Sequence, residues 1–233
     1  MLNRIAVLVP AHNEQDLLPA CLDAIAVAAS AVPGVAVEVI VALDACTDRT
    51  ARVAQDAGVR TVTLAARNVG RARAAAADAA LENGAGGLWL ATTDADSRVP
   101  PLWLARQLWH ASAGADVVAG TVTVEDWSPW PPPLAVTYRT GYDREAWHVH
   151  GANLAAGAPV YLAAGGFPPL ALAEDHAFVA AARRTGHRIA YAHDLPVVTS
   201  SRRTARAAGG FSAFLGRLAA TVPSCRPAGH GGS

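Results

Sequence analysis

The sequence contains no lysine, so all 19 of its basic side chains are arginines. This absence excludes a P-loop nucleotide site, in which a lysine contacts the phosphates. It also excludes enzymes that form a Schiff base through a lysine amine. The arginines balance 19 acidic residues, which gives a formal net charge of zero, whereas nucleic-acid-binding proteins usually carry a basic excess. We therefore expect no nucleic-acid partner.

Cysteines and long apolar runs are also scarce. The three cysteines, Cys21, Cys46 and Cys225, are far apart, which fits neither a disulfide framework nor a zinc site. No apolar run reaches the ~18 residues that a membrane-spanning helix needs. The apolar segment at residues 5–9 is too short for a signal peptide. We expect a cytoplasmic protein without a membrane span.

The first hundred residues alternate between two kinds of apolar pattern. Short apolar segments predict strands at residues 5–10, 35–43, 60–64 and 88–92. Longer segments with helical spacing predict helices at residues 14–31, 48–57 and 70–83. This alternation predicts an α/β fold with a parallel sheet and helices on both faces. In such sheets, ligands bind at the carboxyl ends of the strands.

The second half of the chain is less regular. It predicts helices at residues 101–113, 134–147 and 174–185, and strands at residues 117–124 and 188–192. Prolines make residues 127–133 a stiff loop. Residues 223–233 are expected to form a disordered tail. No internal repeat divides the chain.

Acidic residues follow three of the four strands predicted in the first half. Glu14 follows the first strand, Asp44 and Asp48 the second, and Asp94 and Asp96 the fourth. Two carboxylates at i and i+2 on a turn can both face a hard cation such as Mg²⁺ or Mn²⁺; the alternative is a solvated turn that caps a helix. Asp48 is placed to cap the next helix. This leaves Asp44 free to bind a nucleobase or ribose.

Two arginine clusters could contact phosphates. Arg67, Arg71 and Arg73 lie where a helix begins, and a helix N-terminus favours a diphosphate. Arg202 and Arg203 form the second cluster. Arginine suits phosphate because its planar fork donates two parallel hydrogen bonds. For each cluster, a solvated charged turn is the alternative.

An acidic pair and several aromatic residues complete the candidates. Glu174 and Asp175 open a predicted helix, where the helix dipole alone would favour carboxylates. Gly166 belongs to the loop before them, which we expect to form a flexible wall over the site. Aromatic faces can stack on sugars or lipids, so we expect the acceptor wall to include Trp127, Trp130 and the segment 138–147.

Taken in order, these segments resemble glycosyltransferase family 2. The matching segments are residues 9–14, Asp44 with Asp48 and Thr50, Asp94-Ala95-Asp96, Gly165-Gly166-Phe167 and Glu174-Asp175. The resemblance implies the GT-A fold, in which a Rossmann-like, mostly parallel sheet is flanked by helices in a single domain. We expect that domain to span residues 1–222, with a nucleotide-sugar-binding half at 1–98 and an acceptor-binding half at 99–222.

The resemblance also implies a role for each matching residue. Asp175 resembles the catalytic base, and Asp96 the ligand of a divalent cation, Mn²⁺ or Mg²⁺. The implied donor-binding residues are Pro10, Ala11, Glu14, Asp44, Arg71, Asp94, Ala95, Asp96, Arg202 and Arg203. The expected acceptor-binding residues are Gly166, Glu174, Trp127 and Trp130. A late histidine completes the metal shell in some enzymes with this fold; His193 is the candidate here, whereas surface or capping roles are expected for His148, His150 and His176.

The resemblance implies an inverting, metal-dependent transfer of a sugar from a nucleotide-diphosphate sugar to an acceptor hydroxyl. The acceptor is a small molecule, a lipid-linked molecule or a glycan, and the protein is a possible homodimer. Family members often have two successive acids where this chain has Leu43 and Asp44, and Gly-Ser where it has Ala45-Cys46. The base of the nucleotide therefore stays open.

Two other functions share parts of this pattern. A phosphatase with an Asp-x-Asp motif would need Thr or Val where this chain has Arg98, and it would need a lysine. A degenerate transferase would bind a nucleotide sugar without turning it over. The presence of both Asp96 and Asp175 argues against this second alternative.

Overall fold

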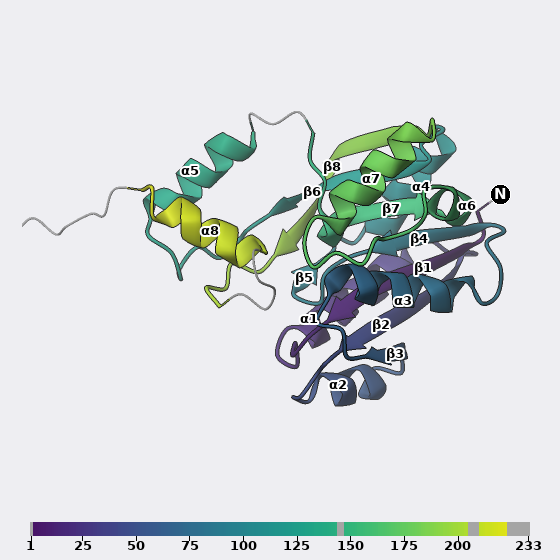
Figure 1. The fold of residues 1–233 in the computed structure, drawn as a ribbon, viewed down its shortest axis with the longest axis horizontal. Coiled ribbons are helices and arrows are strands. Elements are labelled where there is room, and N and C mark those ends of the chain that lie inside the picture. Colours follow the sequence, from purple (N-terminus) through teal and green to yellow (C-terminus); the bar gives the residue numbers. More distant parts are fainter. Residues whose placement is uncertain (1, 144–146, 205–209, 223–233) are drawn as a thin grey trace, which may run out of the picture.

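The protein is described by a computed structural model that covers residues 2–143, 147–204 and 210–222. Its centre is an eight-stranded sheet in the order β3-β2-β1-β4-β7-β6-β8-β5 (Figure 1). The strands are β1 (Arg4–Ala11), β2 (Ala36–Asp44), β3 (Arg60–Leu64), β4 (Leu88–Thr92), β5 (Ser97–Arg98), β6 (Val117–Thr123), β7 (Leu154–Gly157) and β8 (Ile189–Thr199). The helices are α1 (Leu18–Ser30), α2 (Thr50–Asp56), α3 (Val69–Leu81), α4 (Trp103–Ser112), α5 (Pro133–Tyr142), η1 (Gly151–Asn153), α6 (Ala158–Ala163), α7 (Glu174–Arg184) and α8 (Phe211–Ala219).

The sheet is mostly parallel, as the strand–helix alternation predicts. β3, β2, β1 and β4 are parallel neighbours, and β6 is parallel to β8. β7 runs antiparallel between β4 and β6, and β5 is antiparallel to β8. The prediction of a single α/β domain with a mostly parallel sheet flanked by helices is confirmed.

Each face of the sheet is covered by helices. Successive side chains of a strand point to opposite faces, so Val7 of β1 joins a core with α1 and α4, whereas Leu8 joins a core with α3 and α7. The buried face of α3 is almost entirely alanine. Alanine has a short side chain and a high helix propensity, so this helix can lie close against β1 and β2.

The second half departs from the prediction in three places. The helix expected at residues 134–147 is α5, which ends at Tyr142. The strand expected at residues 188–192 is β8, which continues to Thr199. Residues 193–196, which include Pro196, lie where the β6–β8 register shifts, and the pairing resumes at Val197. A proline in the middle of a pattern argues against a central strand, so the sequence favoured too early an end. β7, α6 and α8 were not predicted.

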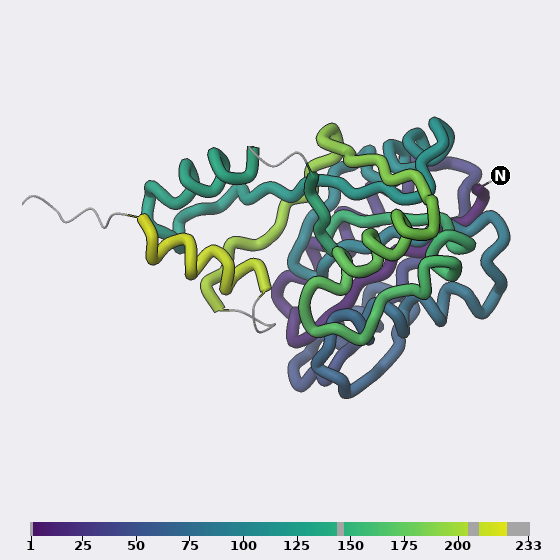
Figure 2. The backbone as a smooth tube through the Cα atoms, turned by 45° about the horizontal axis from the view of Figure 1, so that its top comes forward, coloured from purple at the N-terminus to yellow at the C-terminus, as the bar shows by residue number. Residues whose placement is uncertain are grey.

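Helices α5 and α8 form a small lobe beside the main body. Figures 1 and 2 show both helices away from the sheet, reached through the ends of β6 and β8. The lobe has its own apolar cluster, formed by Trp130, Leu134, Tyr138 and Leu215. No helix among the described residues is long and apolar enough to cross a membrane. The tail expected at residues 223–233 lies outside the described residues.

Candidate active site

A cleft of about 930 Å³ lies at the carboxyl ends of β1, β2 and β4 and extends to the α5–α8 lobe. The parallel strands bring together the acidic residues that follow them, as the sequence analysis expects. Of the expected site residues, the cleft is lined by Pro10, Ala11, Glu14, Asp44, Asp94, Ala95, Asp96, Glu174, Asp175 and Arg202. Among the described residues, six carboxylates line the cleft against four arginines.

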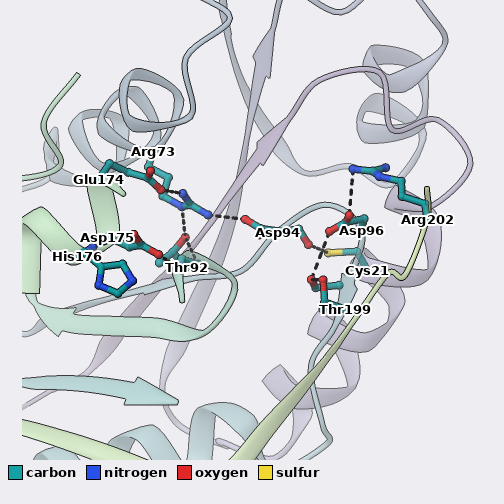
Figure 3. A network of polar contacts seen from close by, with 12 residues as sticks. Cys21, Arg73, Thr92, Asp94, Asp96, Glu174, Asp175, His176, Thr199 and Arg202 are labelled. Atoms are coloured by element: carbon teal, nitrogen blue, oxygen red, sulfur yellow. Dashed lines mark hydrogen bonds and ion pairs between the residues drawn. The ribbon is translucent and has the colours of Figure 1, made fainter. Parts of the chain in front are cut away.

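Two arginines divide the acidic residues into two clusters. Figure 3 shows that Asp94 and Asp96 point in opposite directions, Asp94 toward Arg73 and Asp96 toward Arg202. The two carboxylates of the Asp-x-Asp motif thus belong to different ion-pair networks. The sequence analysis expected both to serve the donor and its cation.

The first cluster is centred on Arg73 of α3. Its guanidinium contacts Asp94 and Glu174, and its Nε donates to Thr92 Oγ1 at 3.0 Å. The side chains of Arg73 and Glu174 are only 3% and 4% exposed. Burial lowers the pKa of Arg73, but Asp94 and Glu174 outweigh it and hold the pKa above its ordinary value. The guanidinium therefore stays charged inside the protein.

Asp175 is held by backbone groups beside this cluster. The amide of Gly151 donates to Asp175 Oδ2 at 2.7 Å, and the amide of His176 donates to Oδ1 at 2.7 Å. The carbonyl of Gly151 accepts from Thr92 Oγ1 at 3.2 Å. A Cβ at Gly151 would overlap the guanidinium of Arg73, so glycine is needed for this close approach.

The second cluster is centred on Arg202, which follows β8. Its guanidinium makes a bidentate pair with Glu14, with both N–O distances at 2.7 Å, and its Nη2 lies 3.0 Å from Asp96 Oδ2. Burial raises the pKa of Asp96 to about 7; Arg202 opposes this shift, while Asp94 and Glu14 add to it. Burial therefore disfavours the ionised form of Asp96 even with Arg202 beside it.

Asp44 has a structural role that was not predicted from the sequence. Its Oδ1 accepts from the amides of Ala66 and Arg67 at 2.7 and 2.8 Å, and its Oδ2 accepts from the amide of Asn68 at 2.7 Å. Arg67 has a positive φ of 46°, a conformation that costs free energy for a non-glycine residue. Asp44 thus holds the turn before α3 while it lines the cleft.

The structure does not bring Arg71 to the cleft. Arg71 is exposed, and because it lies two positions before Arg73, its side chain is rotated by roughly 200° around the helix. Arg73, which is not among the donor-binding residues that the resemblance implies, lines the cleft instead. Helical periodicity could have found it, because Arg73 lies in phase with the buried residues Ala76, Ala77 and Ala80.

Four more expected residues lie outside the cleft lining. Trp127 and Trp130 pack within the lobe, where Trp130 donates its indole N–H to the carbonyl of Ser201. Arg203 lies over the ring of Trp130, with its Cζ 5.3 Å from the ring centroid. Gly166, with a φ of 72°, packs against Tyr161. The lobe residues that do line the cleft include Tyr138, Tyr142, Phe211, Phe214, Arg217 and Leu218, of which the first two lie in the expected segment 138–147.

The histidines separate into two groups. His12, His150 and His176 line the cleft, whereas the buried His148 and the exposed His193 do not. Burial lowers the pKa of His150 to about 4, and its Nε2 lies 2.9 Å from the hydroxyl oxygen of Tyr142. Within the described ranges, no group of three His, Cys, Asp or Glu side chains is arranged to hold a metal.

Known structures share this architecture. One is *Staphylococcus aureus* TarS 1–349 in complex with UDP-GlcNAc, with a TM-score of 0.68 at 17% identity over 93% of this chain and 65% of that chain. Another is *Mycobacterium tuberculosis* glucosyl-3-phosphoglycerate synthase in complex with Mg²⁺ and UDP, with a TM-score of 0.61 at 20% identity over 86% of this chain and 72% of that chain. These likenesses confirm the expected GT-A fold.

The chain spans less than two thirds of TarS 1–349. It covers 60% of TarS 1–349 in the structure whose name gives no ligand and 65% in the complex with UDP-GlcNAc. No curated protein sequence matches the chain significantly. A sequence model described as glycosyl transferase family 2 matches residues 6–159. This match covers more than half of the 233 residues, and the chain therefore belongs to glycosyl transferase family 2.

Proposed function

We propose that the protein is a metal-dependent, inverting glycosyltransferase that moves a sugar from a nucleotide-diphosphate sugar to an acceptor hydroxyl. The observation that carries the proposal is the placement of Asp94 and Asp96 in one cleft with Asp175. Membership of the family supports the transferase class. Neighbours of the same fold crystallised with UDP-GlcNAc, or with UDP and Mn²⁺, support the nucleotide-sugar donor.

The residues of the cleft fit a divalent cation that is shared with the donor. Mg²⁺ is usually bound by one or two carboxylates together with substrate phosphates and water, and not by a cage made only of protein ligands. Asp96 would hold the cation, as the family resemblance implies; it lines the cleft beside Glu14 and Asp94, and a bound cation would offset the burial that raises its pKa. When bound, the cation would stabilise the negative charge of the leaving diphosphate.

Donor binding would use the strand ends around Asp96. Pro10, Ala11 and Asp44 line the cleft and would face the nucleoside. In the structure, Glu14 and Asp96 both contact Arg202. We propose that Arg202 turns from these carboxylates to the diphosphate when the donor binds, because its planar fork suits phosphate oxygens as well as carboxylates.

Asp175 would act as the general base. It would take the proton of the acceptor hydroxyl while the oxygen attacks the anomeric carbon on the face opposite the diphosphate, which inverts that centre. Such a base contributes about 10² to 10⁴ in rate. The bonds from Gly151 and His176 fix the direction of its carboxylate. The lobe residues Tyr138 and Phe211 would form the acceptor wall.

The first experiment is a panel of nucleotide sugars screened by thermal shift with Mn²⁺. A ligand that binds the folded state raises the unfolding temperature, so the panel identifies the donor. The selected donor is then tested for hydrolysis and transfer with Mn²⁺ and with a chelator. Turnover that the chelator abolishes supports the proposal. Binding without turnover would indicate the degenerate transferase, and no binding to any nucleotide sugar would contradict the proposed function.

A further inference from the structure

We propose that Arg73 is a positioning residue for the transfer reaction, which fixes the base Asp175 relative to the donor contact Asp94. This inference rests on the proposed function and adds a residue that the family resemblance did not assign. It also changes the expected role of Glu174, which becomes the partner of Arg73 and not an acceptor contact.

The first step is the burial of Arg73 between two elements that bear site residues. Asp94 follows β4, and Glu174 is the first residue of α7, next to Asp175. The guanidinium contacts both carboxylates (Figure 3). One rigid group thus joins the end of a sheet strand to the start of a helix 101 residues away in the sequence from Arg73. A lysine could not make this fork, because an ammonium group is a single point charge.

The second step is a closed ring of contacts that ends on Asp175. Arg73 donates to Thr92, whose hydroxyl donates to the carbonyl of Gly151. The amide of Gly151 in turn donates to Asp175. Glu174 closes the ring, because it neighbours Asp175 in the chain and contacts Arg73. A displacement of Arg73 would therefore shift Asp175 in two ways, through Gly151 at the start of η1 and through the first turn of α7.

The third step concerns charge. Arg73 also interacts electrostatically with Asp175, and an unpaired cation nearby would make that carboxylate a weaker base. Asp94 and Glu174 neutralise the guanidinium. The cluster can thus hold Asp175 in place while the charge of the guanidinium is balanced by Asp94 and Glu174. The buried arginine is suited to positioning because its charge is already matched in the resting protein.

The test separates positioning from folding by removing the buried charge together with its buried partner. Arg73→Met alone would leave Glu174 buried and unpaired, which is strongly destabilising. Arg73→Met/Glu174→Met removes both buried charges and leaves only Asp94, which is 37% exposed. We expect this double variant to fold with an unfolding midpoint near that of the wild type. We expect its kcat to fall about 100-fold, the loss that a displacement of roughly 1 Å can cause.

The nucleotide site supplies the internal reference. The thermal-shift panel chooses the nucleoside diphosphate, and calorimetry with Mn²⁺ measures its affinity. We expect this affinity to change less than about threefold, or about 0.65 kcal/mol. Arg73→Lys keeps the buried charge without the fork and should also lose kcat. It provides the result if the double variant does not fold. The matched control is Arg60→Met/Glu82→Met, since Arg60 also contacts two glutamates but lies on the surface.

Two outcomes would overturn the inference. One is a double variant whose unfolding midpoint and kcat both equal those of the wild type. The other is a double variant whose nucleotide affinity falls in parallel with its kcat. A readout that does not depend on transfer is the hydrogen exchange of the Gly151 amide, which donates to Asp175. We expect faster exchange in the double variant and unchanged exchange in the control. If the wild type transfers no sugar, the proposed function fails, while unchanged Gly151 exchange would separately refute the positioning role.

Discussion

The two arginine clusters of the cleft look alike in composition but differ in burial. Arg73 and Glu174 are 3% and 4% exposed, whereas Arg202 is 24% exposed and its partners Asp96 and Glu14 are 15% and 6% exposed. Arg73 is also bonded to Thr92 and packed against Gly151. Removing one partner of a fully buried pair leaves an uncompensated charge, whereas solvent can replace the partner of a more exposed pair. The first cluster is therefore a fixed support, and the second can exchange partners.

The largest difference should appear in stability. We expect Arg73→Met to lower the free energy of unfolding by roughly 3–5 kcal/mol, because Glu174 loses its buried partner. Arg202→Met should lower it by less, about 1–3 kcal/mol, because solvent reaches Asp96, although Glu14, which is 6% exposed, also loses its partner. Urea unfolding followed by circular dichroism measures both values. Equal losses in the two variants would remove the distinction between a fixed and an exchangeable cluster.

The two regions should also respond oppositely to pH. His150, beside Gly151, has its pKa lowered to about 4 by burial, so the unfolded chain binds its proton first as the pH falls. Its contribution to stability is complete above about pH 6.5 and is lost between about pH 6.5 and 4. Over this range, the free energy of unfolding of wild type should fall more steeply than that of His150→Gln, by up to about 1.4 kcal/mol per pH unit.

The pKa shift of Asp96, in the second cluster, changes stability with pH in the opposite direction. Its pKa is raised to about 7, so the folded state holds a proton that the unfolded state releases near pH 4. Its contribution to stability is complete below about pH 4 and is lost as the pH rises to about 7. With a chelator present, Asp96→Asn should gain stability relative to wild type between pH 4 and 7. The same sign of slope difference for Asp96→Asn and His150→Gln would contradict this assignment.

The smallest expected effect tests the exchange of Arg202. In Arg202→Gln, Asp96 loses the cation beside it, so Mn²⁺ should bind more tightly in the absence of nucleotide. The variant also loses a guanidinium for the diphosphate, which should weaken nucleotide binding about tenfold, or 1.4 kcal/mol. Calorimetry with Mn²⁺ alone, and then with Mn²⁺ and the selected nucleotide, measures both changes. Two changes of the same sign would show that Arg202 does not exchange.

The first half of the chain was the easier part to predict from the sequence. Strands β1 to β4 and the helices between them follow from apolar runs and helical spacing, because short connections and a buried parallel sheet leave strong local patterns. β7 was missed because Leu154–Gly157 is a four-residue run with no alternation. The end of β8 was misplaced because its pairing with β6 resumes after Pro196, which is a property of the register and not of local sequence.

The candidate site divides in the same way. The acidic residues were predictable because they follow strands, and the chain topology then brings them together. The partners of these acids were not predictable, because Arg73 meets Glu174 across 101 residues and Arg202 meets Glu14 across 188. The tryptophans were misplaced because an aromatic residue in a loop fits both a cleft wall and a small core. Packing of the lobe decides between these two positions.

The central claim is that Asp175 is the base of a sugar transfer whose donor binds elsewhere in the same cleft. The most direct measurement compares Asp175→Asn with wild type for transfer and for Mn²⁺-dependent nucleotide affinity. We expect transfer to fall by about 10² to 10⁴ while the nucleotide affinity changes little. Turnover like that of the wild type in Asp175→Asn would contradict the account.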